Sequence, residues 1–246
     1  MSFVMLIANE CMKIHSRRFF WMISLVLLCI VIMSALFGDY EGSETGFGDM
    51  LIANTNINIL ITFFMVIEAS RIVAAEFSTG TIRMLLIRPV SRTKIMYAKF
   101  FAICLLTAAL MVGLLLTSFI SGYFILPLGS IRGPELLSSY LLNYVFAFIA
   151  ISLAFMMSAV SRSSATATAL SIALTFGSFI GNALFMFGGN NIAKYFWLIN
   201  ADLSPYFGDN EPILDGMTLS FSITVDLIYL LLFHAVAWGV FVRRDV

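Results

Sequence analysis

Six long apolar stretches, separated by polar segments, dominate the order of hydrophobic and polar positions along this chain of 246 residues. Each is unbroken and about 20 residues long, which is the length that an α-helix needs to cross the hydrocarbon core of a membrane. Strands of a membrane barrel would instead be roughly 10 residues long, with polar and apolar positions alternating. The pattern therefore predicts an all-α membrane protein that forms a single transmembrane domain. The predicted spans cover about residues 19–37, 51–73, 99–122, 140–160, 165–187 and 221–242.

The segment before the first span, residues 1–18, has a different pattern. Its polar residues stand at positions 9, 10, 13, 16 and 17, a spacing close to the 3.6-residue period of an α-helix. Such a helix would lay its apolar side on the membrane surface, so we predict an amphipathic, interfacial N-terminal helix. A cleaved signal peptide is disfavoured, because the charged leader is long and no A-x-A site follows the apolar run.

Composition supports the membrane assignment and limits the chemistry. Hydrophobic residues make up 61% of the chain and charged residues 11%, which leaves too little polar surface for a water-soluble domain. The three cysteines, Cys11, Cys29 and Cys104, are odd in number and form no CxxC pattern. A disulfide framework or a structural zinc site is therefore not expected.

The basic residues decide the predicted orientation. With six spans, all of the 14 Lys and Arg residues except Arg132 and Lys194 fall on one side of the membrane. Short loops that are rich in Lys and Arg stay in the cytoplasm. We therefore predict a multi-pass protein of the cell membrane whose termini and 76–98 loop are cytoplasmic, with a long outer loop at 188–220.

The 76–98 loop is basic and contains helix signals. A short helix over 80–88 is predicted, because Pro89 pushes the residue before it out of the helical region. A second helix would begin at Arg92, after Ser91 as its cap. If it continues to the end of the third span, it would reach roughly 46 Å at 1.5 Å per residue, which is longer than the ~30 Å hydrocarbon core. The third span should therefore project into the cytoplasm.

The short predicted helix needs something to cover its apolar face, and its residue pattern leaves two interpretations open. The helix can lie flat on the inner membrane surface, where its arginines would meet anionic lipid. Alternatively, it can bind a socket on a soluble partner. The apolar face consists of Ile82, Leu85, Leu86 and Pro89, with Arg83 and Arg88 beside it.

A family resemblance favours the second interpretation. The chain resembles the bacterial membrane subunits of ABC-2 type transporters, in which the pattern E-x3-G-T-x3-L-x3-P-x-S-R-x6-K follows the second span. In this chain the matching residues are Glu76, Gly80, Thr81, Leu85, Pro89, Ser91, Arg92 and Lys99. The leader, with Asn9, Glu10, Lys13, Arg17 and Arg18, the six spans and the long outer loop are also similar to that family.

The resemblance implies a permease that works with a separate ATP-binding subunit, which would carry the ATP and Mg. The 80–88 helix would be the coupling helix that docks on this ATPase, and the permease would act as a dimer with a second copy or a related permease. It would export a hydrophobic or amphipathic substrate, such as a peptide, an antibiotic or a lipid-like molecule. The residues expected to couple to the ATPase are Glu76, Gly80, Thr81, Ile82, Arg83, Leu85, Leu86, Pro89 and Arg92.

No enzymatic motif is found in this chain. The phosphate-binding pattern GxxxxGK[ST] is absent, and so are HExxH and GxSxG. We therefore predict no catalytic residue, cofactor or metal in the chain and no nucleic-acid partner. ATP hydrolysis would belong to another polypeptide.

Few ionisable residues lie inside the predicted spans, where each is costly. Glu68 lies near the cytoplasmic edge with Arg71 one turn away, so we predict an ion pair between them, with a gating role as the alternative. Asp226, near the outer end of the last span, is expected to reach headgroup water. His234 is expected to pack against a neighbouring helix. The lack of a buried charge relay argues against a proton- or ion-coupled transporter.

Two further patterns concern packing. Small residues recur every four positions in the fifth span and predict close helix packing within the chain, with a dimer interface or a substrate-facing role as the alternative. They are Ala165, Ala169, Ala173, Gly177 and Gly181. In the outer loop, the apolar run 195–199 predicts short helices at the outer leaflet, which Trp and Tyr favour.

A second class of function remains open at this point. The chain can instead be a membrane scaffold or sensor that transports nothing, whose basic loop binds lipid or a regulator. Co-purification of an ATPase that lacks membrane spans distinguishes the two classes.

Overall fold

The computed structural model describes residues 2–38, 46–78, 90–127, 129–161, 163–188, 193–207, 214 and 216–243; the side chains of 178–188, 193 and 198 are outside the description. No strand occurs among these residues, so the all-α prediction is confirmed for the described part of the chain. The elements are α1 Phe3–His15, α2 Arg18–Phe37, α3 Gly46–Ala53, η1 Asn54–Ile57, α4 Asn58–Arg71, α5 Ala74–Ser78, α7 Arg92–Ile125, α8 Gly133–Val160, α9 Ser164–Gly188, η2 Ala193–Tyr195, α10 Trp197–Asn200, η3 Ser204–Phe207 and α11 Leu219–Arg243.

Five helical segments are long and apolar enough to cross a membrane: α2, the α3–α5 series over Gly46–Ser78, α7, α8 and α11. The chain is therefore a membrane protein with several apolar helices. α9 is also a long helix, but the part whose side chains are described, Ser164–Gly177, is shorter than a span. The sixth span stays a prediction.

The helix boundaries agree with the predicted spans in some places and differ in others. α7 begins at Arg92, as predicted, and its 34 residues make it longer than the hydrocarbon core requires. α8 begins at Gly133, before the predicted start near residue 140. Its Pro134 occupies the first turn, where no backbone N–H is needed, and Glu135 lies at the positive end of the helix dipole. These two residues favour the start of a helix, so α8 begins before the predicted span.

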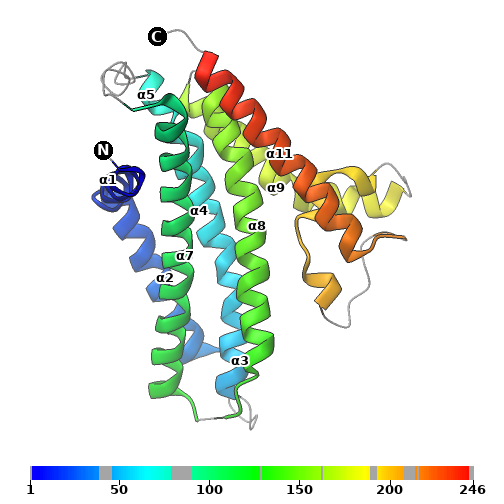
Figure 1. Cartoon of the computed structure of the whole chain (residues 1–246). Coiled ribbons are helices and arrows are strands. Elements are labelled where there is room, and N and C mark those ends of the chain that lie inside the picture. The colour runs from blue at the N-terminus through cyan, green and yellow to red at the C-terminus, as the bar shows by residue number, and fades with distance from the viewer. Residues whose placement is uncertain are drawn as a thin grey trace.

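Figure 1 shows the arrangement of the helices. α2, α7, α4 and α8 run along the bundle, whereas α1 is seen nearly end-on and so lies across it. We call the end with α1, α5 and the beginning of α7 the upper end, and the end with α3 and the beginning of α8 the lower end. The last residues of α11 also lie at the upper end, so the N-terminal helix and the C-terminal end of α11 share one end of the molecule.

α4 is the central helix of the core. It packs against α7, α8 and α9 and buries Ile61, Met65, Val66 and Ala69. α2, in contrast, buries only one stripe along its length and exposes most of its other apolar side chains. An apolar surface of that size is what lipid covers in a membrane protein.

Polar contacts hold the second helical series in place. The series turns between α4 and α5, and Ser158 of α8 accepts hydrogen bonds from the backbone N–H groups of Val73 and Ala74, both at 3.0 Å. A side chain of another helix thus satisfies the donors that a helix beginning leaves unpaired. Towards the lower end, Asn54 accepts from Ser34 at 2.7 Å and donates to Ser118 at 3.1 Å, which joins η1 to α2 and α7.

Candidate functional site

Four charged side chains meet at the upper end of the bundle and form what we call the ion cluster: Glu10 and Lys13 of α1, Glu76 of α5 and Lys99 of α7. Lys99 Nζ lies 2.6 Å from Glu76 Oε1 and 3.0 Å from Glu10 Oε2. Lys13 Nζ lies 2.8 Å from Glu76 Oε1 and 3.9 Å from Glu10 Oε2. The cluster therefore joins three segments that are far apart in the sequence.

Because two members of the ion cluster are buried, their charges must be paired with opposite charges. Lys99 is 0% exposed and Glu76 is 4% exposed. Removing such charges from water costs several kcal/mol per ion, which only close pairing offsets. Two acids and two bases balance each other here, so the cluster is neutral as a whole.

A second ion pair attaches the same N-terminal segment to α4. Arg17 Nη1 lies 2.5 Å from Glu68 Oε2, and the Glu68 side chain is only 7% exposed. The prediction of a pair between Glu68 and Arg71 is therefore wrong in its partner. Arg71 is exposed, whereas Arg17, in the turn between α1 and α2, reaches the buried carboxylate.

The ion cluster lies at the base of the segment predicted to couple to an ATPase. Glu76 and Lys99 are the first and last residues of the pattern that resembles ABC-2 permeases, and their contact brings its two ends together. Arg92, at the beginning of α7, donates from Nη1 to the carbonyl of Val242 at 3.1 Å. Trp238 Nε1 donates to Thr93 Oγ1, also at 3.1 Å. The upper ends of α1, α5, α7 and α11 are thereby connected.

The predicted coupling helix, residues 80–88, lies outside the described residues. Gly80, Thr81, Ile82, Arg83, Leu85, Leu86 and Pro89 lie outside them, in residues 79–89. Of the predicted coupling residues, Glu76 and Arg92 are described, and both contact other helices rather than extending into solvent.

The small-residue stripe of α9 faces outward. Ala165, Ala169 and Ala173 are exposed, and no atom lies within 4 Å of the position of a Cβ at Gly177. The opposite side of α9 packs against α4 and α8 through buried residues such as Ala167. Among the described residues, nothing covers these four positions, and the dimer face stays a prediction. The side chain of Gly181 is outside the described residues.

Of the predictions for the two ionisable groups in the last predicted span, one is confirmed and one is wrong. His234 packs edge-on against Phe100 of α7, with 4.6 Å between ring centroids, which confirms its expected packing role. Asp226 is 4% exposed, so the expectation that it reaches headgroup water is wrong. It is enclosed by apolar side chains of α8 and α11.

The outer loop contains short helices, as predicted, in η2, α10 and η3. Its apolar residues have a partner within the chain, because Trp197 is buried and lies edge-on to Phe233 of α11, with 6.2 Å between the rings. Tyr195 and Phe196 remain exposed. Packing against α9 and α11 thus explains part of the apolar run, and contact with the outer leaflet stays a prediction.

Sequence reasoning missed the partners in the ion cluster, although a signal was present. Lys99 is the one cation in the predicted span 99–122, and a buried lysine requires an acid nearby. Glu76 was recognised through the family pattern, but nothing in the spacing of the chain connects it to Glu10 or Lys13.

Burial beside the cluster, and then the charge of Glu10, raises the pKa of the Cys11 thiol above its ordinary value, which keeps this cysteine protonated.

Comparison with known proteins places the chain among membrane proteins. The family described as "Protein of unknown function (DUF2705)" matches residues 3–246. The "Uncharacterized protein YhcI" of Bacillus subtilis (strain 168) is 32% identical over 224 residues, which cover 83% of this chain and 71% of that protein. The "Uncharacterized membrane protein YdbK" of the same organism is 25% identical over 251 residues, which cover 96% of this chain and 99% of that protein.

Proposed function

The chain belongs to the DUF2705 family, and we propose that it is the permease subunit of an ATP-driven ABC-2 type transporter. In this proposal it resides in the cell membrane with six spans and with both termini in the cytoplasm. A separate ATP-binding subunit docks on the 76–98 loop, and a second permease copy or a related permease completes the transporter. The exported substrate is hydrophobic or amphipathic, such as a peptide, an antibiotic or a lipid-like molecule.

The ion cluster is the observation that supports this proposal most directly. It ties together the two ends of the loop that resembles the coupling loop of ABC-2 permeases, through the contact of 2.6 Å between Lys99 and Glu76. It also fastens α1 to the same point through Lys13 and Glu10. A force applied to residues 79–89 by a partner would therefore reach α1, α5 and α7 together.

In our proposal, the contacts of the ion cluster change when the ATPase docks. Glu76 Oε2 is buried and has no hydrogen-bond partner among the described residues, so one acceptor at the base of the loop is unused. A buried acceptor without a partner is costly, so a new hydrogen bond to this oxygen would be favourable. In our proposal, docking and release of the ATPase shift the pairing at Glu76, and α7 transmits the change across the membrane.

The decisive experiment is co-purification of the tagged full-length chain from membranes of its native host, followed by identification of the ATP-binding proteins retained. We expect an ATPase without membrane spans, and we expect Ile82→Asp and Arg83→Glu each to release it while the chain still inserts into the membrane. The matched control is Arg132→Glu, a charge reversal at the lower end of the bundle, which should retain the ATPase.

Two results of this experiment would contradict the proposed function. If both loop variants keep the ATPase and ATP-dependent transport unchanged, the coupling role of the loop is wrong. If no ATPase is retained by the unaltered chain but the loop binds anionic vesicles, the scaffold or sensor function replaces the transporter.

A further inference from the structure

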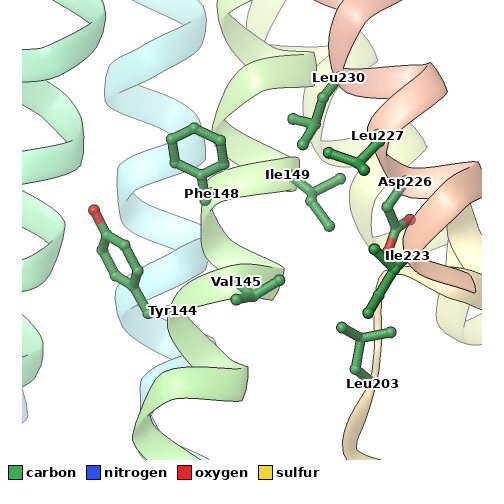
Figure 2. Close-up of a pocket in the computed structure, with 9 residues that line it drawn as sticks. All are labelled: Tyr144, Val145, Phe148, Ile149, Leu203, Ile223, Asp226, Leu227 and Leu230. Carbon is green, nitrogen blue, oxygen red and sulfur yellow. The ribbon is translucent and has the colours of Figure 1, made fainter. Parts of the chain in front are cut away.

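A cavity of about 180 Å³ lies between α8 and α11. Figure 2 shows the lining residues: Ile149 of α8 and Ile223, Asp226 and Leu227 of α11 lie between the two helices, Leu203 of the loop before α11 lies near Ile223, and Tyr144 and Phe148 lie on the side of α8 away from Asp226. The lining is apolar and includes the aromatic rings of Tyr144 and Phe148. Asp226 is its one charged residue.

Asp226 has no counter-charge among the described residues. It is 4% exposed, and neither of its carboxylate oxygens has a hydrogen-bond partner there. The residue is roughly 10 Å along α11 from the first residue of that helix, at 1.5 Å per residue. A buried carboxylate in a membrane helix is expensive unless it is paired, so a residue of this kind usually has a functional reason.

The basic residues near this part of the chain are engaged elsewhere. Arg132 forms ion pairs with Asp49 at 2.6 Å and with Glu135 at 3.2 Å. Lys194 Nζ lies over the ring of Tyr195, 5.5 Å from its centroid. Residues 39–45, 189–192 and 208–213 contain no Lys, Arg or His. Neither the described residues nor these three segments therefore supply a free cation beside Asp226.

The chemistry of the cavity fits an organic cation. An ammonium group would neutralise Asp226. The rings of Tyr144 and Phe148 contribute apolar lining only, because Tyr144 donates from its hydroxyl to the carbonyl of Cys104 in α7 and Phe148 packs against Phe100 of the same helix. The cavity is larger than the ~150 Å³ that suffices for benzene, so a compact alkylated ammonium head can enter it. Its wall residues Ile223 and Leu227 are 40% and 55% exposed, so an apolar tail can extend from the cavity onto the lipid-facing surface.

We propose that this cavity binds the cationic head of an amphipathic molecule, with Asp226 as its counter-ion and the apolar tail of the molecule in the surrounding lipid. The binding itself is independent of transport. That the bound cation is the exported substrate rests on the proposed function above. The same chemistry occurs in free amphipathic amines and in lipids with an amine headgroup, and the experiment separates these sources.

The test measures equilibrium binding of radiolabelled octyltrimethylammonium to the purified full-length chain in nanodiscs of phosphatidylglycerol, without ATPase or nucleotide. We expect saturable binding that Asp226→Asn weakens at least tenfold. The isosteric neutral compound, with carbon in place of nitrogen, should not compete. Glu135→Gln is the matched control, because it removes one carboxylate charge from exposed α8 surface, and it should bind like the unaltered chain.

A second variant covers the case in which Asp226→Asn does not fold. Val145→Phe adds volume at a cavity residue that is 39% exposed and should lower binding by obstructing the cavity. Equal affinities for the unaltered chain and Asp226→Asn, or equal competition by the neutral compound, would overturn the proposal. If the unaltered chain does not bind the cation but still supports ATP-driven export, this inference alone is wrong. If the chain binds the cation but no ATPase associates with it, only the proposed transporter function is wrong.

Addition of phosphatidylethanolamine to the nanodiscs identifies the source of the cation. If phosphatidylethanolamine lowers the binding of octyltrimethylammonium to the unaltered chain but not to Asp226→Asn, the cavity binds an amine lipid of the membrane. Unchanged binding in the presence of this lipid assigns it to a free amphipathic cation.

Discussion

Lys99 is held in a fully buried position by acids from two other segments. Its ammonium group contacts Glu76 of α5 and Glu10 of α1, and no part of the residue is exposed. Lys13 contacts the same two acids, but its side chain is 48% exposed. The two lysines therefore offer a direct comparison between a buried and a partly solvated cation in one cluster.

We predict that Lys99→Met lowers the stability of the purified chain much more than Lys13→Met. The loss of the Lys99 charge leaves excess negative charge in a buried place, for which about 3–5 kcal/mol is typical. Loss of the solvated Lys13 charge should cost about 1 kcal/mol or less. The measurement is the midpoint of thermal unfolding in detergent, followed by tryptophan fluorescence.

A compensating variant separates charge from packing in that experiment. Lys99→Met combined with Glu76→Gln removes one charge of each sign and should recover part of the lost stability. No recovery would mean that the side-chain volume of Lys99, rather than its charge, supports the upper end.

At the scale of helical elements, the lower end is held by close approach of α3 and α7. A Cβ at Gly122 of α7 would lie 2.5 Å from the ring of Phe47 in α3, closer than atoms can approach. Gly113, in the same helix, has nothing within 4 Å of its Cβ position. One glycine is therefore required by packing, and the other is not.

We predict that Gly122→Ala destabilises the chain, whereas Gly113→Ala leaves stability unchanged or slightly higher. A methyl group forced into the contact with Phe47 costs about 1–3 kcal/mol, more than the gain of about 1 kcal/mol in helix propensity. Thermal unfolding of the two variants under identical conditions tests the difference. Equal midpoints would show that α3 moves away from α7 without cost.

The elements could largely be predicted from the sequence, and the contacts between them could not. Runs of apolar residues of membrane-spanning length predicted α2 and the long α7, because the backbone hydrogen bonds of such a run must be satisfied within a helix. The early beginning of α8 was missed, since Pro134 reads as a breaker unless its position in the first turn is known. The partners of Glu76 depend on where α1 lies, and no local pattern determines that.

At the scale of the whole molecule, the outward surface of α9 is a candidate face for a second copy. Small side chains let another helix come close in a membrane, where packing rather than the hydrophobic effect favours association. The described members of the stripe, from Ala165 to Gly177, are not covered by other parts of the described chain. The predicted dimer would place two such stripes face to face.

We predict that Ala169→Cys forms a disulfide-linked dimer under mild oxidation in the membrane, in a variant from which the native cysteines have been removed. Ala169 is exposed on the stripe, so two cysteines at this position would meet in the dimer. Ala167→Cys is the matched control, because Ala167 lies two residues away and is 0% exposed. Electrophoresis without reducing agent reports the product; equal yields of crosslinked dimer from both variants would exclude the stripe as the interface.

The ion cluster also has a consequence for how the protein is made. Lys13 leaves the ribosome first, but Glu76 follows 63 residues later and Lys99 only after a further 23. Since chains are synthesised from the N-terminus, α1 has no partners in the cluster until the segments that carry them have emerged. The N-terminal helix is therefore the first element synthesised, but it cannot reach its final place before the beginning of α7 has emerged.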